Sequence, residues 1–179
     1  AIAGSGYVSG GGSGDGGDLR YLNNIPVIPG ETLTIDLGGV ASVNAYGHNP
    51  GIRIMWGADG RSYPSNAGDA IVRGQTVVSL ANTTWTVPDK VTLIHACAQQ
   101  QDGSKAAVSL VVSGSTVLRA QNGARIGDGG GDGGASTDGG GGGGGGYAGN
   151  GGATGDNGTG GAGAGGDSSY AYWVQDPVW

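Results

Sequence analysis

The sequence predicts an all-β protein: an antiparallel β-sandwich or small barrel that carries a packed, polyglycine II-like glycine-rich segment. Three observations lead to this prediction. The middle of the chain is a series of short segments that are rich in β-branched residues and bounded by turn signals. No segment shows a helical period. Glycine, 44 of the 179 residues, is concentrated outside the middle region, with 24 in residues 127–166 and eight in residues 4–17.

The clearest strand is expected at residues 31–37, where Leu33, Ile35 and Leu37 alternate with polar residues after a Pro29-Gly30 turn signal. Its apolar side chains would share one face of a sheet. Further strands are expected at residues 40–46, 52–56, 76–80, 84–87, 91–98, 106–112 and 116–120.

Turn chemistry and the large aromatics complete the predicted β domain. Residues 113–115, Ser-Gly-Ser, should join the last two strands as a hairpin, and Asn122-Gly123 marks another turn. Trp56 and Trp85 each fall within a strand and are expected in the core. At about 100 residues, this region has the size of one small domain.

The glycine-rich segment allows two interpretations. Gly, Ser, Asp and Asn bury too little apolar surface to offset about 1–2 kcal/mol of backbone entropy per ordered residue, which favours disorder. Extended three-residue-per-turn helices can instead pack closely when side chains are only hydrogen, and the aromatic residues 169–179 could dock on the core. We therefore expect an N-terminal glycine-rich segment (1–18), a β domain (19–126), a glycine-rich excursion (127–168) and a docked C-terminal segment (169–179).

Charge and cysteine content exclude several classes of protein. Acids and bases balance through Arg125, and all six excess acids follow it, so the tail would repel nucleic acid. No apolar run approaches the ~20 residues that cross a bilayer, so no membrane insertion is expected. The single Cys97 cannot form an intrachain disulfide.

Four stretches of the sequence resemble segments of known proteins. Residues 16–39 (GGDLRYLNNIPVIPGETLTIDLGG) and 85–97 (WTVPDKVTLIHAC) are similar to two blocks of the glycine-rich tail-fibre and adhesin domains of tailed phages. Residues 52–65 (IRIMWGADGRSYPS) resemble a segment of virion structural proteins, those of marine phages especially, and residues 147–152 (YAGNGG) add a weaker match.

The resemblance implies a distal tail-fibre or tail-tip module of an extracellular virion. Packed polyglycine helices would present their connecting loops to a host glycan or outer-membrane protein, and the chain would join other fibre proteins, as a homotrimer. A purely structural virion component, such as a capsid decoration or fibre-assembly protein, is the main alternative. A third interpretation is a glycine-rich ice-binding protein, which would need a flat face of Thr and Ala residues. A fourth interpretation is a bacterial surface or matrix protein.

Catalytic and cofactor motifs are absent from the sequence. There is no Gly-x-Ser-x-Gly motif, and His48 and His95 have no metal or triad partner nearby in the sequence. His95 is expected as a core or sheet-face histidine. The match to Gly-x-Gly-x-x-Gly at residues 129–134 is accidental, because no helix follows it. We therefore expect neither an enzyme nor a cofactor.

A calcium repeat is disfavoured as well. Asp128, Asp132 and Asp138 stand in a glycine background, but the spacing is irregular and the apolar repeat position is missing. These acids are expected to solvate the segment and to discourage aggregation between sheet edges. No metal site is predicted.

Receptor contacts are expected at the turns between glycine runs, where larger side chains emerge from the backbone lattice. Tyr147 is the central candidate, since Tyr offers contact area at little cost in rotamer entropy; it could also simply pack over neighbouring glycine backbone. The full set of expected receptor-binding residues is Tyr147, Asn150, Thr154, Asp156, Asn157, His48 and Tyr63. For His48, an exposed turn residue without a ligand is the competing interpretation.

Overall fold

The computed structural model describes residues 17–38, 50–57, 62–63, 76–79, 81–100, 107–121 and 124–133. The described residues form eight strands and no helix. The strands are β1 (Leu19–Pro26), β2 (Thr32–Asp36), β3 (Gly51–Met55), β4 (Thr76–Ser79), β5 (Thr83–Thr86), β6 (Leu93–Gln99), β7 (Val108–Val112) and β8 (Ser115–Ala120). In this part of the chain, nothing forms a helix long and apolar enough to cross a membrane.

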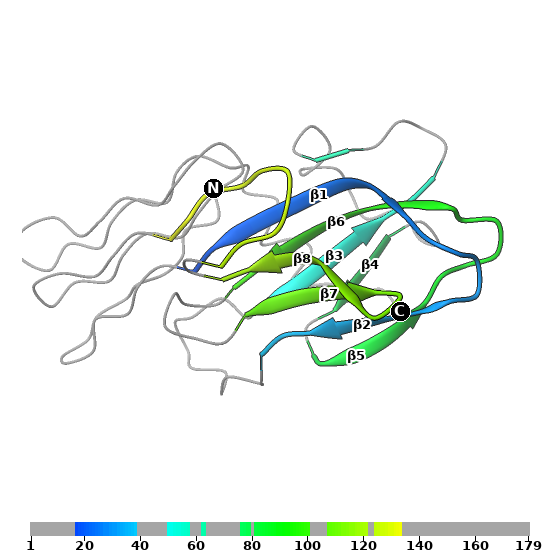
Figure 1. The fold of residues 1–179 in the computed structure, drawn as a ribbon, viewed down its shortest axis with the longest axis horizontal. Helices are drawn as coiled ribbons and strands as arrows, with labels where there is room; N and C mark the ends of the chain where they lie inside the picture. Colours follow the sequence, from blue (N-terminus) through cyan, green and yellow to red (C-terminus); the bar gives the residue numbers. More distant parts are fainter. Residues whose placement is uncertain are drawn as a thin grey trace, which may run out of the picture.

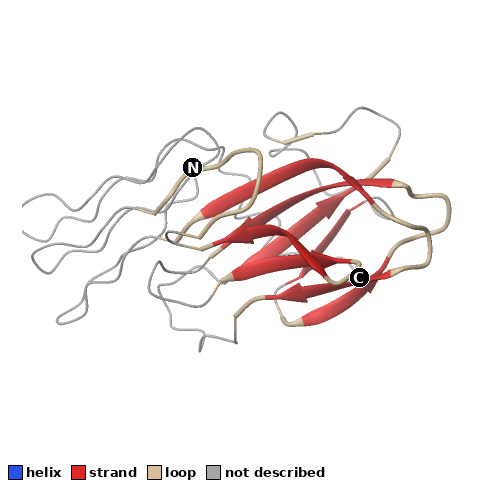
Figure 2. Cartoon of the chain, in the orientation of Figure 1, coloured by secondary structure: helices blue, strands red, loops and turns tan. Residues whose placement is uncertain are grey.

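The strands form two antiparallel sheets that pack face to face (Figures 1 and 2). Sheet I has the order β1-β6-β3-β4, and sheet II has the order β5-β2-β7-β8. Both sheets remain open, so the fold is a β-sandwich rather than a closed barrel. The prediction of an all-β sandwich is confirmed, whereas the predicted polyglycine packing concerns residues 127–168, of which the structure describes only 127–133.

The core lies between the two sheets and follows the predicted alternation. In β2, Leu33 and Ile35 are buried while the intervening polar residues are exposed. Trp56 is 8% exposed and its ring centroid lies 5.0 Å from that of Trp85, which is partly buried and packs against the core. The other buried members of this core are Ile25, Val27, Leu37, Ile52, Ile54, Val87, Ile94, Ala96, Ala98, Val108, Leu110, Val112, Leu118 and Ala120.

The hairpin between β7 and β8 has the predicted turn. Ser113 (φ 49°) and Gly114 (φ 78°) are the two central residues, and both lie in the left-handed region. Positive φ at both positions is what a type I′ turn requires, and its twist matches that of the flanking strands. The sequence signal at residues 113–115 therefore specified the local geometry.

Strand β1 is the element that the sequence patterns did not predict. Asn23, Asn24 and Pro26 interrupt any alternation of apolar and polar residues. The pairing with β6 shifts register between Leu22 and Ile25, and Asn24 has φ 55°, so the strand contains a bulge. The strand expected at residues 40–46 lies outside the described residues.

Sheet I is buried on its outer face as well as on its core face at β3 and at Cys97 in the neighbouring strand β6. Every residue of β3 is buried, although in an antiparallel sheet only alternate residues need be. Arg53, Met55 and Cys97 are at most 1% exposed, yet they alternate along their strands with core residues. Tyr63, 3% exposed, packs over this outer face and donates its hydroxyl to the Arg53 carbonyl at 3.5 Å.

Candidate functional site

The site described best is the base of the glycine-rich segment, residues 124–133, which crosses from one sheet to the other. Arg119 in edge strand β8 exchanges two backbone hydrogen bonds with Ile126, at 2.9 and 3.1 Å. Farther along, the Tyr21 N–H in edge strand β1 donates to the Gly129 carbonyl at 3.0 Å, and the Leu19 N–H donates to the Gly131 carbonyl at 3.0 Å. The segment thus closes the side of the sandwich where β1 and β8 lie together (Figure 1).

Glycine is required at this base because the backbone of the segment runs directly against β1. A Cβ at Gly127 would lie 2.8 Å from the Tyr21 carbonyl oxygen. A Cβ at Gly129 would strike the Tyr21 ring, and one at Gly130 would strike the Leu19 carbonyl oxygen. Gly130 also has φ 109°, which L side chains rarely adopt. The first glycines of the tail are therefore packing residues.

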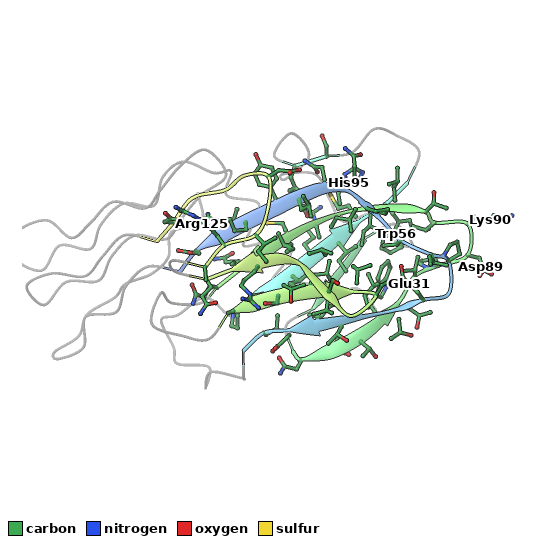
Figure 3. All side chains as sticks on the ribbon, in the orientation of Figure 1. Glu31, Trp56, Asp89, Lys90, His95 and Arg125 are labelled. Atoms are coloured by element: carbon green, nitrogen blue, oxygen red, sulfur yellow. The ribbon has the colours of Figure 1, made fainter. Side chains whose placement is uncertain are left out.

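Asp132 lies between two arginines and ties the segment to the sandwich. One carboxylate oxygen accepts from Arg20, whose side chain is only 4% exposed, and the other accepts from Arg125. Burial works to raise the pKa of Asp132, but the hydrogen bonds from the two guanidinium groups outweigh it and hold that pKa below its usual value. Figure 3 shows Arg125 at the end of the sandwich from which the segment departs.

Asp18 provides a second, buried attachment. It is 0% exposed, and its Oδ1 accepts from the Gly133 N–H at 2.8 Å, while its own carbonyl accepts from Gln100 N–H at 2.8 Å. Burial is the main cause that raises the pKa of this carboxyl, against the favourable Gly133 hydrogen bond and the charge of Arg20. Within the described residues, Oδ2 has no hydrogen-bond partner.

A third group of contacts surrounds Asn23 at the bulge in β1. The Asn23 side-chain amide pairs with the Tyr63 backbone: the Tyr63 N–H donates to Oδ1 at 2.9 Å, and Nδ2 donates to the Tyr63 carbonyl at 2.8 Å. The Asn23 backbone N–H donates to the Asp128 carboxylate at 3.2 Å. The rings of Tyr63 and Tyr21 stack with centroids 6.1 Å apart. These contacts connect the outer face of sheet I to the glycine segment.

The structure brings one predicted receptor-binding residue into this neighbourhood. Tyr63 is 3% exposed, and burial raises the pKa of its hydroxyl well above the usual value, so this side chain offers a partner almost no surface. Its described contacts hold the fold together. The other predicted residues lie outside the described part of the chain: His48, Tyr147, Asn150, Thr154, Asp156 and Asn157.

Sequence reasoning missed the residues that hold the base. Asp128 and Asp132 were expected to face solvent, but Asp128 accepts from the Asn23 backbone and Asp132 binds two arginines. The distribution of charge in the sequence was the one available signal for these ion pairs. Arg20 and Arg125 lie at the two ends of the β domain, close to the glycine-rich segments. His95 is a sheet-face residue, as expected, and its Nδ1 lies within hydrogen-bond distance of Asn23 and Asn24.

Neither a metal-binding geometry nor a similarity to known proteins assigns a function to this site. In the described ranges, no three His, Cys, Asp or Glu side chains gather as a metal site would require. No protein-family model, no curated protein and no solved structure matches this chain. The function must therefore be inferred from the molecule itself.

Proposed function

We propose that this chain is a tail-fibre or tail-tip module of a bacteriophage virion that binds a receptor on the bacterial surface. The observation that carries the proposal is the rigid attachment of the glycine-rich segment. Its first seven residues, 127–133, are fastened by backbone hydrogen bonds to β1, by the Asp132 ion pairs and by Asp18. A linker that only joins two domains would need no such attachment.

A fixed base favours binding through entropy. Loops that leave a rigid support lose less conformational freedom when a ligand immobilises them, and that saving increases affinity. In this proposal, the side chains between glycine runs, with Tyr147 and Asn157 foremost, contact a host glycan or outer-membrane protein. Tyr63 acts indirectly, by holding the outer face of sheet I in place.

The resemblance to phage tail-fibre domains falls on residues that build this support. The block at residues 16–39 contains β1 and β2, and the block at residues 85–97 contains most of β6. Residues 52–65 contain β3 without its first residue, together with Tyr63. The similar blocks therefore form the scaffold under the glycine segment, which supports the same use of that scaffold here.

Attachment to other virion proteins belongs, in this proposal, to the opposite end of the sandwich. Arg125 and Lys90 lie at opposite ends of the described sandwich in Figure 3. Near Lys90, the chain exposes two large apolar side chains, Ile28 at 66% and Leu93 at 49%. A fibre partner, and the proposed homotrimer, would have apolar surface to bury there while the glycine end faces the host.

Binding of the labelled full chain to bacterial cells tests the proposal. The probes are a panel of intact bacteria and purified lipopolysaccharide, with binding measured by flow cytometry and biolayer interferometry. We expect the double variant Tyr147→Ala/Asn157→Ala to lose at least tenfold in affinity. The exposed β5 variant Thr84→Ala is the matched control and should bind as the unmodified chain does.

Two results would contradict different parts of the proposal. Equal binding by the double variant and the control would move the receptor site away from the glycine turns. If the intact chain bound no cell or glycan and yet was incorporated into virions, the purely structural virion role would replace receptor binding.

A further inference from the structure

The outer face of sheet II carries a regular array of threonines. Strands β2 and β5, side by side in Figure 1, each contain a Thr-x-Thr sequence, at Thr32 and Thr34 and at Thr84 and Thr86. All four residues are exposed, while the apolar residue between each pair packs in or against the core. Thr32 lies directly opposite Thr86, and Thr34 lies directly opposite Thr84. The four threonines therefore form the corners of a rectangle on one face of the sheet.

Sheet geometry sets the sides of this rectangle. Residues two apart along an antiparallel strand are separated by about 6.8 Å, and paired strands lie about 4.8 Å apart. These distances are close to the two repeats of the oxygen atoms on a prism face of hexagonal ice. Each corner offers one hydroxyl and one methyl group, and the branched Cβ of threonine restricts its rotamers. The array therefore loses little side-chain entropy when it meets an ordered layer of water.

The hydroxyl groups of this array are available to water. In the part of the chain that the structure describes, nothing hydrogen-bonds to the hydroxyls of these four threonines. The row formed by Thr34 and Thr84 continues across the sheet through Val111 and Thr116, which are half-buried. This row thus presents hydroxyl and methyl groups on all four strands of sheet II.

The array is also free of charge. Asp36 is the next residue of β2 on this face, and it marks one end of the uncharged rows. Ice has no net charge, and a charged group pressed against it would lose hydration without gaining a partner. The rows contain no aromatic side chain on which a sugar ring could stack. A neutral lattice of water therefore complements this face better than a glycan or a charged partner does.

We propose that the outer face of sheet II binds ice through Thr32, Thr34, Thr84 and Thr86. The hydroxyls hold water molecules at lattice positions, and the methyl groups pack between those waters. This activity goes beyond the proposed function and uses a different part of the molecule, because β5 is the edge of sheet II farthest from β8, where the glycine segment begins. Adjacent strands twist by about 20–25° relative to each other, so the lattice match is confined to neighbouring strands. We therefore expect inhibition of ice recrystallisation and not a large depression of the freezing point.

Recrystallisation of ice in the presence of the full chain tests the proposal. Thin films of polycrystalline ice are held just below the melting point, and grain growth is followed by microscopy. The chain should slow grain growth, and a fluorescently labelled chain should adsorb to the prism faces of a single ice crystal. Thr34→Lys should raise the concentration required by roughly tenfold or more, since it presses a charge against the ice. The matched control is Thr92→Lys, at an exposed site outside the strands, and its potency should equal that of the unmodified chain.

The proposal fails if the unmodified chain neither slows grain growth nor adsorbs to the crystal. It also fails if Thr34→Lys and Thr92→Lys are equally potent, because the activity would then not depend on the array. Should Thr34→Lys not fold, as judged by the fluorescence of the core tryptophans, Thr86→Lys replaces it, since β5 is an edge strand and edge strands commonly carry lysine. None of these outcomes changes the cell-binding test of the glycine turns.

Discussion

Replacing Gly130 with Ala tests whether the glycine segment is attached through backbone contact with β1. The new Cβ would meet the Leu19 carbonyl oxygen, a backbone atom that cannot move without disturbing β1. The residue would also keep φ 109°, at a cost of about 1–2 kcal/mol for a non-glycine residue. Both effects favour detachment of the segment.

The upper limit of the effect follows from the bonds that detachment would break. Four backbone hydrogen bonds join residues 128–131 to β1: Leu19 N–H donates to Gly131, Tyr21 N–H donates to Gly129, and the N–H groups of Asp128 and Gly129 both donate to the Tyr21 carbonyl. At about 1 kcal/mol each, they limit the loss to about 4 kcal/mol before the regained chain entropy is counted. We expect Gly130→Ala to lower the free energy of unfolding by about 2 kcal/mol.

Gly114→Ala is the matched control for the cost of positive φ. Gly114 has φ 78°, and a Cβ there meets nothing within 4 Å, so this variant carries the conformational cost without a clash. Urea denaturation measures both variants, and hydrogen exchange of the Leu19 and Tyr21 amides reports the attachment directly. The reasoning fails if Gly130→Ala is no more destabilising than Gly114→Ala and both amides stay protected.

Three further predictions concern the charges and the core. Asp132→Asn should cost about 1–2 kcal/mol in urea denaturation, because it leaves the buried Arg20 guanidinium without its carboxylate; a change below 0.3 kcal/mol would contradict this. Asp18→Asn should stabilise the protein at neutral pH, where burial penalises the carboxylate, and the gain should vanish below about pH 4, as thermal melts at several pH values would record. A stabilisation by Asp18→Asn that is the same at every pH would contradict this prediction. Trp56→Ala should cost about 3–5 kcal/mol and Trp85→Ala clearly less, since Trp85 is only partly buried, and equal losses would contradict the assigned packing.

Local patterns in the sequence predicted the sandwich where they were strong. The alternation at Leu33 and Ile35 fixed the inward face of β2, and Ser113-Gly114 fixed the turn between β7 and β8. Strand β1 escaped prediction because its partners determine it: a bulged strand with two asparagines is held by β6 on one side and by the glycine segment on the other.

The candidate site was less accessible to sequence reasoning because its contacts are distant in the chain. Asp132 binds Arg20 across 112 positions, and Asn23 pairs with the Tyr63 backbone across 40. From the sequence alone, an aspartate in a glycine run such as Asp132 is expected to be solvated, and a tyrosine in a loop such as Tyr63 is expected to be exposed. Only the partners found in the structure show that both side chains are held. The spacing of residues along the sequence predicts neither the ion-pair partner of the aspartate nor the contacts of the tyrosine.

The position of the base at the end of the β domain has a consequence for synthesis of the protein. Asp18 and the Gly133 N–H are 115 positions apart, so the contact can form only after nearly the whole sandwich has left the ribosome. Until then, the N–H groups of Leu19 and Tyr21 on the β1 edge lack the carbonyls that they finally bind, and an unpaired edge is where a second chain can add a strand. The β1 edge would therefore stay open to pairing with a second chain until the glycine segment has been made.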